Sequence, residues 1–113
     1  MKAKIGILVS FIVIAILSVS LRLYKLTGPI ADWHSWRQSD TAAVARNYLV
    51  NGIDPLHPRY DDLSNIQTGF DNPQGYRMVE FPLYQTLGAY IGTVLPSVSI
   101  EVILRILTII ATT

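Results

Sequence analysis

Apolar positions concentrate at the two ends of this 113-residue chain, and polar positions fill its middle. From Ile5 to Leu21 the sequence carries no charge, while Lys2 and Lys4 precede this run and Arg22 and Lys25 follow it. A helix of about 20 apolar residues crosses a hydrocarbon core about 30 Å thick, and flanking cations extend to the water interface. The pattern therefore predicts a transmembrane helix over residues 1–26.

The same run has one alternative interpretation, a cleaved signal peptide. Ser18-Val19-Ser20 is an acceptable small-x-small cleavage site. Apolar segments recur downstream, however, and this favours a retained membrane anchor.

A short helix is expected in the polar middle of the chain, from Ser39 to Asn51. Ser39 is a suitable N-cap, Asp40 would lie in the first turn, and Gly52 would end the helix in the left-handed region. The apolar stripe at helical spacing is Ala45, Tyr48 and Leu49. We expect an amphipathic helix that lies along the membrane surface or against other helices.

Residues 53–77 are rich in Pro, Gly and Asp and are expected to form a loop. Apolar runs return at 81–96, as a second transmembrane helix, and at 97–113, as the truncated start of a third. Pro96-Ser97 is expected to form the turn between them. The expected fold class is an all-α membrane protein. An N-terminal spanning helix leads to an exoplasmic loop at 27–80 that carries the short surface helix, and further spanning helices follow. The end within an apolar run predicts a fragment of a longer polytopic protein.

Charge determines the expected orientation and narrows the class of partner. Lys2 and Lys4 favour a cytoplasmic N-terminus, and the acidic excess of residues 27–80 favours an exoplasmic loop. The formal net charge is +1 and no stripe of basic residues occurs, so nothing favours a nucleic-acid partner. The chain has no cysteine, which excludes a disulfide framework and thiolate chemistry.

The polar segment from Asp32 to Thr41 holds the strongest candidates for chemistry. Arg37 and Asp40 lie three residues apart, so they can pair on one helix face. A carboxylate there can polarise an acceptor hydroxyl, and a guanidinium can bind a phosphate bidentately. The plainer interpretation, a capped helix with a local ion pair, is favoured by these residues taken alone.

Two further charges lie at or within apolar runs. Glu80 precedes an apolar run, where it either faces a cavity or is a solvated boundary residue. Arg105 lies inside the last run, where it faces a bundle interior, a cavity or the membrane surface. His34 and His57 are far apart in sequence, so no metal site and no cofactor are predicted. A divalent metal is compatible with the sequence without being indicated by it.

The string HSWRQSDTAAVARNYL at residues 34–49, followed by Asn51-Gly52 and by EFPLY at residues 80–84, resembles the N-terminal region of bacterial GT-C membrane glycosyltransferases. These enzymes are relatives of the protein O-mannosyltransferases and the lipid A aminoarabinose transferases. The resemblance extends from Leu21 to about Arg105. It implies a multi-span helical bundle, a catalytic Asp in the first exoplasmic loop, and inverting transfer of a sugar from a polyprenyl-phosphate donor.

The resemblance also implies roles for individual residues. Asp40 would be the catalytic carboxylate, because it belongs to the Trp-Arg-Gln-x-Asp-Thr string. Asp32 is its rival. A gapless alignment on Arg46 places the Asp of the aminoarabinose branch at Arg37, so the acidic role must pass, with a shift in register, to Asp40 or Asp32. That branch has Lys-Pro-Pro where this chain has Glu80-Phe81-Pro82. Arg37 and Arg46 would bind the phosphate, and the residues expected to line the substrate are Trp33, His34, Trp36, Gln38 and Glu80.

The expected function is that of a glycosyltransferase, with this chain as an N-terminal part that is inactive alone. Its expected location is a bacterial inner (plasma) membrane, which it crosses several times. The expected partners are a polyprenyl-phosphate-linked sugar, a glycan, lipid or protein acceptor, and membrane lipids. The alternative is a small non-enzymatic membrane protein whose loop binds a partner or braces a complex. An open reading frame that continues through further spans would favour the enzyme.

Overall fold

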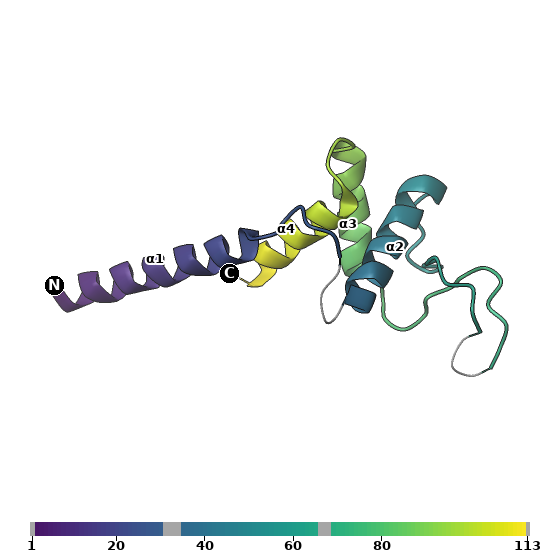
Figure 1. Cartoon of the computed structure of the whole chain (residues 1–113), viewed down its shortest axis with the longest axis horizontal. Helices are drawn as coiled ribbons and strands as arrows, with labels where there is room; N and C mark the ends of the chain where they lie inside the picture. Colours follow the sequence, from purple (N-terminus) through teal and green to yellow (C-terminus); the bar gives the residue numbers. More distant parts are fainter. Residues whose placement is uncertain (1, 31–34, 66–68, 113) are drawn as a thin grey trace.

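The computed structural model describes residues 2–30, 35–65 and 69–112, and this part of the chain is helical (Figure 1). Its helices are α1 (Lys2–Leu23), α2 (Ser35–Asn51), α3 (Leu83–Val94) and α4 (Ile100–Thr112). Within the described residues the only pairing of extended chain is an isolated antiparallel bridge between Arg59 and Tyr76. The predicted all-α class is therefore confirmed for these residues.

Helix α1 extends away from the other three helices as a separate rod (Figure 1). Its 20-residue stretch Lys4–Leu23 is the one helix of the described chain that is long and apolar enough to cross a membrane. None of that stretch is buried within the fold, and Ile7, Phe11 and Leu21 are each at least 70% exposed. Folding therefore leaves an apolar helix surface that lipid or other protein must cover.

Helices α3 and α4 form a hairpin around the predicted turn at Pro96-Ser97, where the Val98 N–H donates to the Leu95 carbonyl oxygen. Helix α3 begins two residues after the start of the expected range 81–96, and α4 begins three residues after the start of the expected range 97–113. With 12 and 13 residues they are about 18 and 20 Å long, shorter than a hydrocarbon core of about 30 Å. Each is too short to cross that core alone within its described bounds.

Helix α2 begins at Ser35, four residues before the predicted start, so the predicted N-cap role of Ser39 is wrong. The segment Trp36-Arg37-Gln38 contains no helix breaker, and nothing stops the helix from extending through it. The predicted end is confirmed: the Gly52 N–H donates to the Tyr48 carbonyl oxygen, and Gly52 has φ +95°. Glycine adopts this left-handed conformation without the steric cost that a Cβ would add.

The small core lies where α2 packs against α3 and α4. The α2 residues it buries are Ala42, Ala43, Val44, Ala45 and Tyr48. Two residues of the predicted stripe, Ala45 and Tyr48, are among them, while Leu49 remains 39% exposed. Of the two predicted settings for this helix, the structure shows packing against other helices.

Close contact between helices depends on two glycines of α3, which had not been singled out in the sequence. Gly88 faces Leu104 of α4, and Gly92 faces Leu49 of α2. A Cβ at Gly88 would lie 2.6 Å from Leu104 Cδ2, well inside van der Waals contact. The two glycines are one turn apart, so a single face of α3 meets both neighbours.

Residues 24–30 join α1 to the other helices. Here Lys25 has a positive φ of 59°, which turns the chain after the last residue of α1. The Arg105 guanidinium of α4 donates to the carbonyl oxygens of Leu26 and Gly28, both at 2.6 Å. It also reaches the Lys25 and Pro29 carbonyl oxygens at 3.2 and 3.4 Å. Arg105 is thus half-buried and holds this turn.

Replacing Gly88 by valine should destabilise the packing of α3 on α4. The added side chain overlaps Leu104, which is itself buried, and overpacking of this kind costs about 1–3 kcal/mol. The check is the thermal unfolding midpoint of the helical signal in detergent micelles. Gly6→Val is the matched control, since a Cβ at Gly6 meets nothing within 4 Å. Equal midpoints for the two variants would contradict the packing argument.

Candidate functional site

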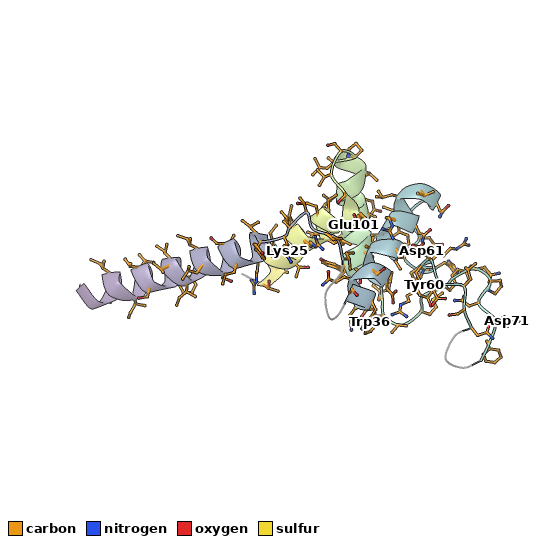
Figure 2. The ribbon with its side chains drawn as sticks, viewed as in Figure 1. Lys25, Trp36, Tyr60, Asp61, Asp71 and Glu101 are labelled. Atoms are coloured by element: carbon orange, nitrogen blue, oxygen red, sulfur yellow. The ribbon has the colours of Figure 1, made fainter. Side chains whose placement is uncertain are left out.

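A cavity of about 840 Å³ opens where α1 ends, between residues 24–30, the first half of α2, and α4. We call it the junction cavity. Its charged lining residues are Arg22, Lys25, Arg37, Glu101 and Arg105. Figure 2 shows Lys25 at the end of α1, close to where α4 returns toward that helix. Basic side chains from α1, residues 24–30, α2 and α4 therefore meet at one opening.

The junction cavity is amphiphilic. Ile30, Leu104 and Ile109 contribute apolar wall, and four cations face one carboxylate among its lining residues. Both Arg105 and Arg22 donate to backbone carbonyl oxygens: Arg105 to those of Leu26 and Gly28, and Arg22 to that of Thr112 at 2.9 Å. An anionic head group attached to a hydrocarbon chain has the polarity that such a lining accommodates.

Asp40 borders a second, smaller cavity of about 80 Å³, which we call the Asp40 cavity. Arg37 and Thr41 line both cavities, so one turn of α2 forms the wall between them. The side chains of Asp40 and Arg77 are each 28% exposed, and their charged atoms lie 2.9 Å apart. The carboxylate is therefore held next to the junction cavity but not inside it.

The sequence spacing had suggested that Arg37 and Asp40 pair with each other, but in the structure they do not. Each pairs instead with residues 77–80: Arg37 with Glu80 at 2.9 Å, and Asp40 with Arg77 at 2.9 Å. Backbone bonds place this segment, because the Arg77 N–H donates to the Pro58 carbonyl oxygen beside the Arg59–Tyr76 bridge. These two ion pairs attach residues 77–80, which lie between α2 and α3, to the first half of α2.

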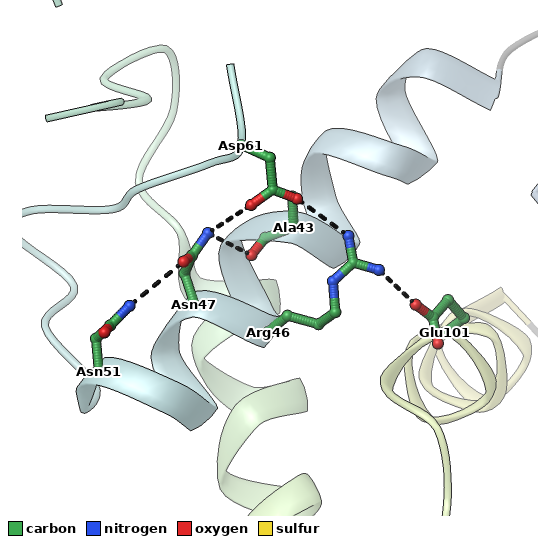
Figure 3. Close-up of polar contacts among 6 residues, drawn as sticks. All are labelled: Ala43, Arg46, Asn47, Asn51, Asp61 and Glu101. Carbon is green, nitrogen blue, oxygen red and sulfur yellow. Dashed lines mark hydrogen bonds and ion pairs between the residues drawn. The ribbon is translucent and has the colours of Figure 1, made fainter. Parts of the chain in front are cut away.

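Arg46 sits further along α2 and makes a different kind of contact (Figure 3). Its guanidinium bonds Glu101 Oε1 at 2.9 Å and Asp61 Oδ2 at 3.3 Å. Asn47 donates to the other oxygen of Asp61 at 3.1 Å. Arg46 borders neither the junction cavity nor the Asp40 cavity, but lines a separate one with Arg105. Arg46 therefore links Asp61, in the chain between α2 and α3, to Glu101 of α4. Its role in binding phosphate stays a prediction.

The other predicted site residues divide into two groups. Trp36 lines the Asp40 cavity, and Gln38 lines the junction cavity. Asp32, Trp33 and His34 lie outside the described residues. Among the residues that the structure does describe, no group of three or more His, Cys, Asp or Glu is placed to hold a metal ion.

Three residues of the site were not predicted as such. Arg22 and Lys25 were noticed only as flanks of the apolar run, although cations at the end of a spanning helix lie where lipid head groups are found. Arg77 had no signal in the sequence, since its partner Asp40 is 37 positions away. Only the fold brings these two charges together.

A fourth cavity, of about 260 Å³, lies at the C-terminal end of α2 and is polar. There His57 Nδ1 lies 2.8 Å from Asp54 Oδ2. This hydrogen bond is the main cause that lowers the pKa of Asp54. The Leu56 N–H, which donates to the same carboxylate, acts in the same direction. The arrangement stabilises the turn that follows Gly52.

Comparisons of this chain with protein-family models, with curated proteins and with solved structures gave no match. The geometry of the site is therefore what indicates a function. That geometry is a membrane-length helix, a basic amphiphilic cavity at its end, and a carboxylate behind one shared wall.

Replacing Arg105 by lysine should loosen the wall of the junction cavity. Lysine keeps the charge but presents three donors on a compact ammonium in place of the planar, five-donor guanidinium, and bonds to a charged donor contribute about 1.5–3 kcal/mol. The amides of Leu26 and Gly28, which bond within this turn, should then exchange with solvent about tenfold faster or more. Hydrogen exchange followed by mass spectrometry measures this. Arg59→Lys, at an exposed site over Tyr76, is the control and should change nothing at these amides.

Proposed function

We propose that this chain is the N-terminal part of an inverting glycosyltransferase. The full-length enzyme would move a sugar from a polyprenyl-phosphate donor to an acceptor on the exoplasmic side of the membrane. The observation that carries the proposal is the junction cavity: a basic, partly apolar opening at the end of a membrane-length helix, separated from Asp40 by Arg37 and Thr41. The family resemblance noted in the sequence points the same way.

In this proposal the donor lipid lies along α1 and its phosphate enters the junction cavity. Arg22, Lys25 and Arg37 come from different segments and supply positive charge around that position. During transfer the bond between the sugar C1 and the phosphate oxygen breaks, and the phosphate takes the bonding electrons. Cations already in place stabilise that developing charge without reorganising at the moment of reaction.

Asp40 takes the proton in this mechanism. The acceptor hydroxyl attacks C1 from the side opposite the phosphate, which inverts the anomeric centre, and its proton passes to the Asp40 carboxylate. Arg77 holds that carboxylate by an ion pair at 2.9 Å. Trp36 borders the same cavity and offers a ring face against which a sugar can pack.

The membrane arrangement is part of the proposal. Helix α1 crosses a bacterial plasma membrane with Arg22 and Lys25 at the exoplasmic face, and the loop at 27–80 stays on that side. Helix α4 returns to the end of α1, where Arg22 bonds the Thr112 carbonyl oxygen. The α3–α4 hairpin would thus sit at the membrane boundary as the beginning of the multi-pass part.

One observation favours the alternative, a membrane protein that braces a complex. Leu83, Leu87, Tyr90 and Val94 are spaced by four, three and four residues on α3 and are 69%, 49%, 59% and 76% exposed. This spacing places them on one helix face, turned away from the face that carries Gly88 and Gly92. A continuous apolar stripe of this kind suits contact with another helix or with lipid.

In the intact enzyme, Asp40→Asn should abolish sugar transfer while leaving expression and donor binding nearly unchanged. The amide keeps the size of the side chain but cannot accept the proton, and losing a general base costs about 10²–10⁴-fold in rate. Initial transfer rates in membrane vesicles, with a polyprenyl-phosphate sugar as donor, measure the effect. Asp32→Asn tests the rival residue. If only Asp32→Asn is inactive, the assignment of Asp40 is wrong, and two active variants would refute a role for either carboxylate.

The loop should be reached from the exoplasmic side. The chain has no cysteine, so Ser64→Cys introduces a unique exposed thiol. An impermeant maleimide added to intact cells should label it. Lys4→Cys, at the other end of α1, is the control and should react only after the membrane is permeabilised. The reverse pattern would place the loop in the cytoplasm and contradict the proposed topology.

A further inference from the structure

Arg37 occupies a position that two cavities share. It lines the junction cavity together with Arg22 and Lys25, and it lines the Asp40 cavity together with Glu80. In the structure its Nη2 donates to Glu80 Oε2 at 2.9 Å. The guanidinium that could meet an anion in the junction cavity is therefore held by a carboxylate of the same chain.

This ion pair is easily broken. The side chains of Arg37 and Glu80 are 65% and 51% exposed, so water screens their attraction, and such pairs contribute little net stability. Arginine also has a long, flexible side chain with five donor hydrogens. A phosphate offers several charged oxygens to that planar group, whereas Glu80 uses one oxygen in this contact.

Once released from Arg37, the Glu80 carboxylate has an alternative partner in the N-terminus of α3. Glu80 lies two residues before Pro82, the N-cap of α3, and no side chain makes a hydrogen bond at that N-cap. The first-turn N–H groups of a helix and its dipole both favour a negative charge nearby. The Leu83 N–H already donates to the Phe81 carbonyl oxygen, so a Glu80 side chain turned toward α3 would meet the N–H groups that follow it.

We propose that Glu80 is an exchangeable counter-ion of Arg37, which the phosphate of the lipid donor displaces as it enters the junction cavity. This inference rests on the proposed function and adds a regulatory step to the same site. In the empty state Glu80 neutralises Arg37 and holds it on the side of the Asp40 cavity. In the occupied state Arg37 contacts the phosphate, and Glu80 moves to the α3 N-terminus.

The direction of the effect separates this role from a positioning role. A competing carboxylate weakens anion binding, so removing its charge should strengthen binding. A carboxylate that merely orients Arg37 for the ligand would have the opposite effect, because its loss would leave the guanidinium mobile. Glu80→Gln preserves size and tests the two roles with one measurement.

The test measures the dissociation constant of geranylgeranyl phosphate for the full-length protein in detergent micelles, by microscale thermophoresis. For Glu80→Gln we expect binding two- to fivefold tighter than for the wild type, equivalent to about 0.4–1 kcal/mol. Arg37→Gln should bind more weakly, and adding Glu80→Gln to it should give no further gain. Geranylgeraniol, which lacks the phosphate, should bind wild type and Glu80→Gln equally.

Asp61→Asn is the matched control. It removes a carboxylate from another exposed arginine pair, with Arg46, which lies outside the junction cavity. Its dissociation constant should equal that of the wild type. An equal gain in Asp61→Asn and Glu80→Gln would mean that only overall charge matters, and would overturn the exchange.

The two proposals fail in different ways. If the wild type binds geranylgeranyl phosphate and Glu80→Gln binds it equally or more weakly, the exchange is wrong and the donor site remains. If neither protein binds the phosphate better than the alcohol, the donor site of the proposed function is wrong, and the exchange falls with it.

Discussion

The contact of Arg105 with the turn at 25–29 is the interaction on which the rest of the arrangement depends. None of the stretch Lys4–Leu23 is buried within the fold, and α1 meets α4 at its end through the bond from Arg22 to the Thr112 carbonyl oxygen, so the turn that follows α1 helps to place that end. One guanidinium gathers carbonyl oxygens that a chain leaving a helix would otherwise present to water. Without that contact the junction cavity would lose one wall, and Lys25 would have no defined position relative to α2 and α4.

Two kinds of force hold the remaining parts together. Helices α2, α3 and α4 pack through small residues such as Ala45, Ala89 and Gly88, which allow close approach. The loop between α2 and α3 is instead fastened to α2 by ion pairs that are partly or largely exposed. Packed helices resist displacement, whereas exposed ion pairs exchange partners at low cost. A rigid scaffold with exchangeable charges beside its cavity suits the anion binding that we propose for it.

The amphiphilic character of the junction cavity follows from its position. One side is the end of an apolar helix, and the other is formed by the polar segments that follow it in the chain. Any cavity at such a boundary combines hydrocarbon with cations, because basic residues end spanning helices at the water interface. What distinguishes this cavity is its neighbour, since Arg37 and Thr41 separate it from a carboxylate held by its own arginine.

Local features were predictable from the sequence because each depends on neighbouring residues. The charge-free run up to Leu21 specified α1, Gly52 specified the end of α2, and Pro96-Ser97 specified the turn before α4. The start of α2 was less predictable, because a serine caps a helix only where the preceding residues cannot join it. Ser39 follows three ordinary helix formers, and the helix begins at Ser35. The candidate residues Arg37, Asp40 and Glu80 could be named, but not paired.

By itself the sequence determined that the chain is helical, that one helix has the length and polarity of a membrane span, and where its charges lie. Only the tertiary structure decided which charges meet. Arg37 pairs with Glu80 rather than with Asp40, Asp40 pairs with Arg77, and Arg105 bonds carbonyl oxygens of the turn at 25–29. These partners are tens of residues apart in the chain. Electrostatic attraction acts through distance in space, and spacing in sequence reports that distance only within a single helix or turn.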